Sequence, residues 1–163
     1  IYSFADIVAK GNPQWIEVCN TKYIIGDLSL FSNYKVNPSA LKGMCMEKVH
    51  AFSKLYPSRE KYVNKFGYDP KQLHHIIRLV HILEKKVNVY EYTEQEKEYM
   101  LDIKRGRFPN SLEEATALRD EYVNRLTNIY QEAKIVYNQQ EIDYEILDNI
   151  VLKYLCKDHK CKQ

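Results

Sequence analysis

The chain has 163 residues, which is the size of one domain and enough to bury a sizeable hydrophobic core. Hydrophobic residues make up 45% and charged residues 28%, proportions that exclude an intrinsically disordered or collagen-like chain. Lys and Arg number 24 against 22 acidic residues, and this net charge of +2 means that any basic binding site must be local.

Apolar residues recur at helical spacing nearly throughout, so the sequence predicts a mainly α domain of five or more helices. At the N-terminal end, Ser3 is expected to cap a short helix that Gly11 stops. Asn12 followed by Pro13 favours the start of another helix, because Pro suits a first helical turn. Residues 20–36 predict only short elements around a glycine.

Two longer helices are predicted next. The first runs from Pro38 to Leu55, and Pro57 ends it. The second begins at Asp69 and Pro70, where Asp is a good cap and Pro a good first helical residue. The second helix carries a single apolar stripe, made of Leu73, Ile76, Ile77, Val80, Leu83 and Val87.

Capping boxes predict the starts of two further helices. Thr93 pairs with Glu96 in the first, and Ser111 pairs with Glu114 at the start of a long helix. Between the helix that begins at Pro70 and the helix that Thr93 caps, Val and Tyr alternate over residues 87–92, a pattern that allows a short strand.

A last helix is predicted over residues 143–155, and the pattern as a whole suggests three parts. Residues 1–36 hold short predicted elements, and residues 37–155 hold the longer predicted helices. Residues 156–163 are expected to be a flexible tail.

The cysteines show no disulfide-framework spacing, which favours a reduced, cytoplasmic protein. No apolar run approaches the ~20 residues of a membrane span, so no membrane partner is expected. Near the C-terminus, Cys156, His159 and Cys161 offer three potential zinc ligands, but no second half of a zinc site is evident. A structural metal and a metal-free Lys-rich terminus both remain open.

One helix face suggests binding of an anion. Lys71, His75 and Arg78 stand at i, i+4 and i+7, so they lie within about 60° of one another and opposite the apolar stripe. Such a row of cationic and hydrogen-bonding groups suits phosphates. A polar face on a helix packed on one side is the simpler explanation. His74 and His81 lie off this line and are interpreted as packing or surface residues.

A second basic group lies at residues 104–107, where cations complement the dipole at the end of a helix without needing another role. The sequence lacks the phosphate-binding loop, the nucleophile elbow and the zinc-protease motif. It also lacks a pair of strand carboxylates that would hold magnesium.

Three sequence blocks follow one another along the chain. The first has Lys-Gly-Asn-Pro followed by an apolar-Glu pair, within residues 4–17. The second has Gly-Tyr-Asp-Pro-Lys followed by His and Arg, within residues 67–78. The third has Asp-Ile-Lys-Arg-Gly followed by Ser-Leu-Glu-Glu, within residues 102–114. In this order, over roughly residues 2–136, the blocks resemble nucleotidyltransferases of the DNA polymerase beta superfamily, of the RNA-repair-associated (RlaP-like) type found in bacteria and phages.

The resemblance implies the helical C-terminal portion of an enzyme that transfers a nucleotide from a nucleoside triphosphate to an acceptor, with RNA as a candidate acceptor in repair or modification. By this resemblance, residues 1–36 would be a connector that follows a missing catalytic core, and residues 37–155 would be a helical domain that binds nucleotide or substrate. Lys71, His75, Arg78 and Arg105 would bind the substrate. The α/β catalytic core, whose carboxylates bind Mg²⁺, would lie before Phe4, so no catalytic residue or metal ligand is expected in this chain. The alternative is a non-catalytic helical module that binds protein or RNA. The sequence leaves the nucleotide, the acceptor and the oligomeric state open.

Overall fold

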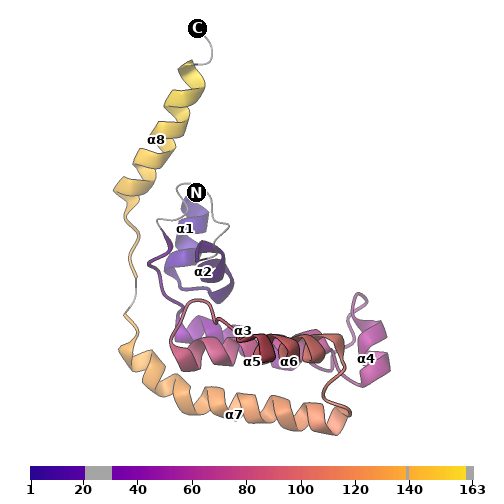
Figure 1. Cartoon of the computed structure of the whole chain (residues 1–163). Coiled ribbons are helices and arrows are strands. Elements are labelled where there is room, and N and C mark those ends of the chain that lie inside the picture. Colours follow the sequence, from indigo (N-terminus) through magenta and orange to yellow (C-terminus); the bar gives the residue numbers. More distant parts are fainter. Residues whose placement is uncertain (21–30, 139, 161–163) are drawn as a thin grey trace.

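The computed structural model describes residues 1–20, 31–138 and 140–160, with the backbone alone for residues 150 and 154–160. These residues form eight helices and no strand, which confirms the predicted mainly α fold (Figure 1). The short elements predicted around Gly26 lie outside the described residues. The helices are α1 (Tyr2–Ala9), α2 (Pro13–Cys19), α3 (Pro38–Ala51), α4 (Glu60–Phe66), α5 (Pro70–Lys85), α6 (Glu94–Arg105), α7 (Leu112–Val136) and α8 (Tyr144–Lys160).

Helix α5 is the centre of the fold, because it packs against α3, α6 and α7 (Figure 1). The side chain of Asp69 caps it by accepting a hydrogen bond from the amide of Lys71 at 3.0 Å, and Pro70 occupies the first turn. Contact on several sides widens the buried surface beyond the predicted stripe. Its buried residues are Pro70, Leu73, Ile76, Ile77, Leu79, Val80, Ile82 and Leu83.

A second, smaller hydrophobic cluster joins α1, α2 and the start of α8. It is made of Ala5, Val8, Ile16, Cys19, Phe31 and Leu147. Val36 packs against both this cluster and the main core, so it lies where the two meet. Beyond its first turns α8 extends away from the other helices (Figure 1). Among the described residues, no helix combines the length and the apolar character needed to cross a membrane.

Two predicted boundaries and one predicted cap are wrong. Helix α3 ends at Ala51 instead of Leu55, because the Phe52 carbonyl accepts a hydrogen bond from the Asp69 amide at 2.7 Å and the chain turns there. Ser3 lies inside α1 and does not cap it, since that helix begins at Tyr2. Helix α8 continues to Lys160, five residues beyond the predicted end at Leu155.

The strand allowed by the alternating residues 87–92 does not form. Lys86 adopts the left-handed conformation (φ 53°) that ends α5, and no neighbouring strand is present in the described chain to pair with the segment. The Tyr90 and Tyr92 rings instead pack near His81, with centroids 5.1 and 5.9 Å from the imidazole. The alternation therefore reflects tyrosines packing on a helix.

Candidate anion-binding face on helix α5

The predicted binding residues of α5 differ in their exposure. Lys71 is exposed in the first turn, whereas His75 and Arg78 are half-buried. The face is therefore not turned fully to solvent: its N-terminal end is open, and further along it is covered by neighbouring elements. A half-buried cation interacts more strongly with an anion than an exposed one, because solvent screens it less.

Arg78 has a carboxylate partner that sequence reasoning did not assign. Its Nη1 lies 2.5 Å from both carboxylate oxygens of Glu17 in α2, and the two side chains are only 23% and 28% exposed. The Nε of Arg78 is buried without a hydrogen-bond partner. Arg78 therefore joins α2 to α5 and keeps an unused donor. No sequence signal indicated this partner, because Glu17 lies 61 residues from Arg78 along the chain.

His75 and its neighbour His74 are held neutral. Burial lowers the pKa of His75 to about 4, and the charges of Arg78, His74, Lys71 and Lys48 lower it further in the same direction. Burial likewise lowers the pKa of His74 to about 4, aided by the charges of Lys104, Arg78 and Lys71. Neutral imidazoles surrounded by cations can donate hydrogen bonds to an anion without adding a charge.

The positive charge of Lys104, at the end of α6, contributes to the lowered pKa of His74, so we group Lys104 with this face. Arg105, which the sequence analysis names, follows it in the last turn of α6, and both side chains are exposed. Helix α6 ends at Gly106, whose left-handed φ of 69° turns the chain. We call Lys71, His74, His75, Arg78 and Lys104 the anion face.

No group of three or more His, Cys, Asp or Glu side chains in the described part of the chain is arranged to hold a metal. The side chains of Cys156, His159 and Cys161 lie outside the described residues, so the zinc alternative stays untested. Cys19 and Cys45 are buried free thiols.

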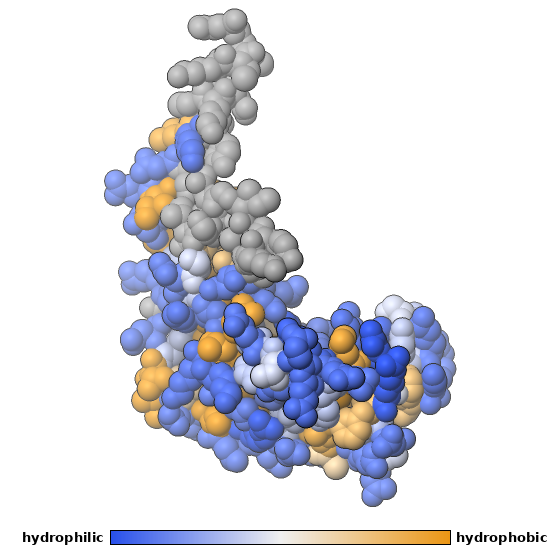
Figure 2. All heavy atoms as spheres, viewed as in Figure 1, coloured by the Kyte–Doolittle hydropathy of each residue, from blue (hydrophilic) through white to orange (hydrophobic). Residues whose placement is uncertain are grey.

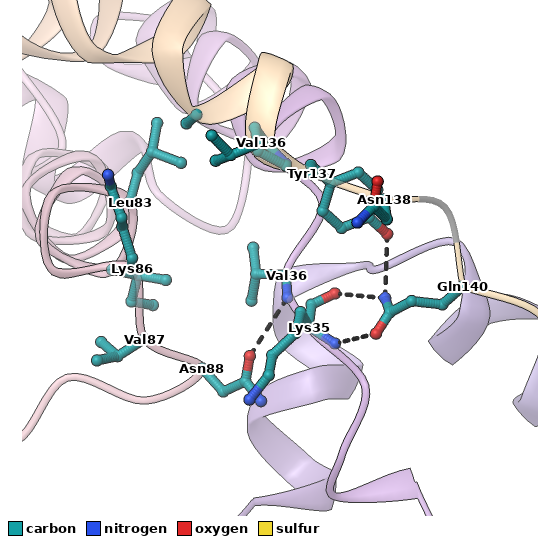
Figure 3. Close-up of a pocket in the computed structure, with 13 residues that line it drawn as sticks. Lys35, Val36, Leu83, Lys86, Val87, Asn88, Val136, Tyr137, Asn138 and Gln140 are labelled. Carbon is teal, nitrogen blue, oxygen red and sulfur yellow. Dashed lines mark hydrogen bonds between the residues drawn. The ribbon is translucent and has the colours of Figure 1, made fainter.

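An apolar cavity of about 440 Å³ lies at the C-terminal end of α5, ~20 Å along the helix from Lys71 (Figure 3). At its rim the Gln140 side chain donates to the Lys35 carbonyl at 2.9 Å and accepts from the Lys35 amide at 2.5 Å. The Asn88 side chain accepts from the Val36 amide at 3.3 Å. The backbone amides of Lys35 and Val36 at this rim are therefore already hydrogen-bonded within the chain. The cavity is separate from the anion face, because it lies at the opposite end of α5.

In comparisons with family models, curated proteins and solved structures, no match to this chain is found. The anion face therefore stands on its geometry. It combines three cations and two neutral imidazoles from α5 and α6, one of the cations being paired with Glu17.

Proposed function

We propose that this chain is the helical C-terminal portion of a cytoplasmic nucleotidyltransferase, which transfers a nucleotide from a nucleoside triphosphate to an acceptor such as RNA. One observation carries the proposal: the three sequence blocks that suggested it meet in space. Arg78 of the second block binds Glu17 of the first, and Lys104 of the third acts on His74 of the second. Blocks far apart in sequence are expected to converge when they form one site.

In this proposal the anion face binds the triphosphate. Lys71 and Lys104 supply the two exposed positive charges, and Arg78 supplies a guanidinium that Glu17 holds in a fixed orientation. His75 supplies a neutral hydrogen-bonding group. The proposed Mg²⁺ and its carboxylates belong to a catalytic core outside the described residues, so these groups bind and orient the nucleotide.

The proposal is tested by titrating the protein with ATP, GTP, CTP and UTP and measuring affinity by calorimetry. Charge-assisted contacts to phosphate contribute about 1.5–3 kcal/mol each, so Lys71→Ala and Lys104→Ala should each weaken binding by about tenfold. Lys85→Ala is the matched control, because Lys85 is an exposed lysine in the last turn of the same helix. Absence of nucleotide binding, or an equal loss in the control, would contradict the proposal.

Glu17→Gln separates the two roles of Arg78. The substitution removes the carboxylate that competes with phosphate for the guanidinium. If Arg78 binds phosphate, Glu17→Gln should keep or increase nucleotide affinity while it lowers the free energy of unfolding. Arg78→Ala should lower both. A nucleotide affinity unchanged by Arg78→Ala would make Arg78 a purely structural partner of Glu17.

The second candidate function is a non-catalytic helical module that binds RNA or protein. The cations and aromatic rings around α4 favour it. The same titration separates the candidates, since a module of this kind would bind its macromolecule but none of the four nucleoside triphosphates.

A further inference from the structure

Around α4, several cations lie over aromatic rings. The Lys54 Nζ lies 5.2 Å from the centroid of the Tyr56 ring, and the Lys65 Nζ lies 4.8 Å from that of Phe66. The Tyr62 ring carries two cations, with the Arg59 Cζ at 4.2 Å and the Lys61 Nζ at 5.0 Å. Four cation–ring pairs therefore lie within residues 54–66.

The lysines of this segment are free to bind another molecule. Lys54, Lys61 and Lys65 are exposed, and none of them forms an ion pair with a residue that the structure describes. Of the two acids in residues 54–71, Asp69 is 1% exposed and is paired with Arg59, so Glu60 is the only exposed one. Positive charge is therefore concentrated here, although the net charge of the whole chain is only +2.

Two contacts hold α4 beside the anion face. The Arg59 guanidinium binds the Asp69 carboxylate through Nε at 2.8 Å and Nη2 at 2.5 Å, directly before α5 and Lys71. On the other side, the Phe66 ring packs so closely on Gly106 that a Cβ there would lie 2.6 Å from the Phe66 Cζ. Gly106 follows Lys104 and Arg105, so α4 contacts both the start of α5, next to Lys71, and the end of α6, next to Lys104.

The surface around α4 also offers an aromatic ring for stacking. Tyr56 is 40% exposed, and Tyr62 is half-buried between its two cations. In Figure 2 the end of the molecule formed by α4 shows hydrophilic side chains interspersed with less hydrophilic and hydrophobic ones. We call Lys54, Tyr56, Lys61, Tyr62 and Lys65 the α4 surface.

We infer that the α4 surface binds single-stranded nucleic acid. Lys54, Lys61 and Lys65 bind successive backbone phosphates, Tyr56 stacks on an unpaired base, and Tyr62 keeps Lys61 in position. A duplex keeps its bases stacked inside the helix, and an acidic peptide has charges but no bases, so neither uses Tyr56. The inference rests on the proposed function, because it places the nucleic-acid acceptor next to the face that binds the nucleotide.

The test measures binding of a fluorescein-labelled RNA of about 15 nucleotides by anisotropy, without nucleoside triphosphate and at several salt concentrations. Lys61→Ala/Lys65→Ala should weaken binding by about tenfold and lower the slope of log K against log salt by about 1.4, because each single-strand phosphate contact contributes about 0.7. The matched control is Lys85→Ala/Lys134→Ala, which removes two exposed lysines elsewhere. It should change the affinity less than about twofold.

A second pair of variants tests the stacking contact. Tyr56→Ala should weaken RNA binding by about fivefold or more, and Tyr56→Trp should restore it. Tyr144→Ala removes an exposed tyrosine of α8 and should have no effect. Equal loss in both lysine variants, equally tight binding of duplex RNA or of an acidic peptide, or no effect of Tyr56→Ala would overturn the inference. Nucleotide affinity is measured separately, so each proposal can fail alone.

Discussion

Asp69 shows how single residues set the local electrostatics. It is the only buried charged side chain among those that the structure describes, at 1% exposed. Burial acts to raise its pKa, but hydrogen bonds from Arg59, the Lys71 amide and Gln72 outweigh it, so the pKa is lowered and the carboxylate stays ionised. One carboxylate thus caps α5 and also holds Arg59. His74 and His75 of α5 show the opposite behaviour, because burial keeps their imidazoles uncharged.

His74 and His75 predict how stability depends on pH. Their pKa of about 4 in the folded protein lies below the ordinary 6.5, so the unfolded chain binds protons that the folded chain does not as the pH falls below 6.5. The free energy of unfolding should therefore fall between pH 6.5 and pH 4, by about 1 kcal/mol per pH unit for each histidine.

Urea denaturation at pH 7 and pH 5 measures this effect. The His74→Gln/His75→Gln variant should lose most of the difference between the two pH values, because Gln does not titrate. His50→Gln, on an exposed part of α3, is the control and should keep it. A double variant as sensitive to pH as the parent protein would contradict this prediction, because it would show that the two imidazoles have the same pKa in the folded and unfolded chains.

At the scale of elements, helix ends follow local chemistry closely. The Thr93 hydroxyl accepts from the Glu96 amide, and the Glu96 carboxylate accepts from the Thr93 amide at 2.8 Å, so the predicted capping box is confirmed. At α7 only half of the predicted box forms: Ser111 caps the helix, but Glu114 binds the amide of Asn110 at 2.9 Å. The carboxylate still satisfies a backbone donor just before the helix, one residue away from the expected one.

Gly106 combines two demands, a left-handed backbone and close contact with α4. Gly106→Ala should lower the free energy of unfolding by about 2 kcal/mol, because φ is +69° and the new Cβ would meet the Phe66 ring. Thermal and urea unfolding measure the change. In a Phe66→Leu background, where the ring is gone, the same substitution should cost about 1 kcal/mol.

Gly43 provides the matched control within α3. It lies inside the helix with nothing within 4 Å of its Cβ position, so Gly43→Ala should raise stability by about 0.5–1 kcal/mol. Equal effects of the two glycine substitutions would mean that neither the left-handed backbone nor the Phe66 contact matters.

At the scale of the whole molecule, two hydrophobic clusters meet at Val36. The main cluster surrounds α5, and the smaller one holds the first and last helices together (Figure 1). Leu147, which is 2% exposed, is the only buried residue that α8 contributes to the smaller cluster among the side chains described. Hydrogen bonds from the Tyr2 hydroxyl to Asp148 and from the Tyr144 hydroxyl to Asp6, the latter at 3.4 Å, supplement this buried contact.

Leu147→Ala should release α8 while the helices around α5 stay folded. Hydrogen exchange should become faster in the first turns of α8 and stay unchanged in α5, and the free energy of opening of the smaller cluster should fall by about 2–5 kcal/mol. Leu152→Ala, at a position that is 55% exposed on the same helix, should change stability by less than about 0.5 kcal/mol. Faster exchange throughout α5 would show instead that the clusters form one cooperative unit.

The sequence by itself determined most of the helices and several of their starts. Asn12, Asp69, Thr93 and Ser111 act on amides two or three residues away, and Pro prefers a first turn wherever the helix later packs. These interactions are local, so residue order alone indicates them. Helix α4 was missed because it is short and buries none of its side chains, and therefore carries no apolar stripe.

Only the tertiary structure decided what surrounds Arg78. Its spacing with Lys71 and His75 predicted a shared face, but the partner Glu17 lies 61 residues away in the sequence and comes from α2. The effect of the Lys104 charge on the pKa of His74 depends on how α6 packs on α5, and the low pKa of His75 depends on burial by other helices. Charges and burial act through space, and the distances that govern them exist only once the helices have packed.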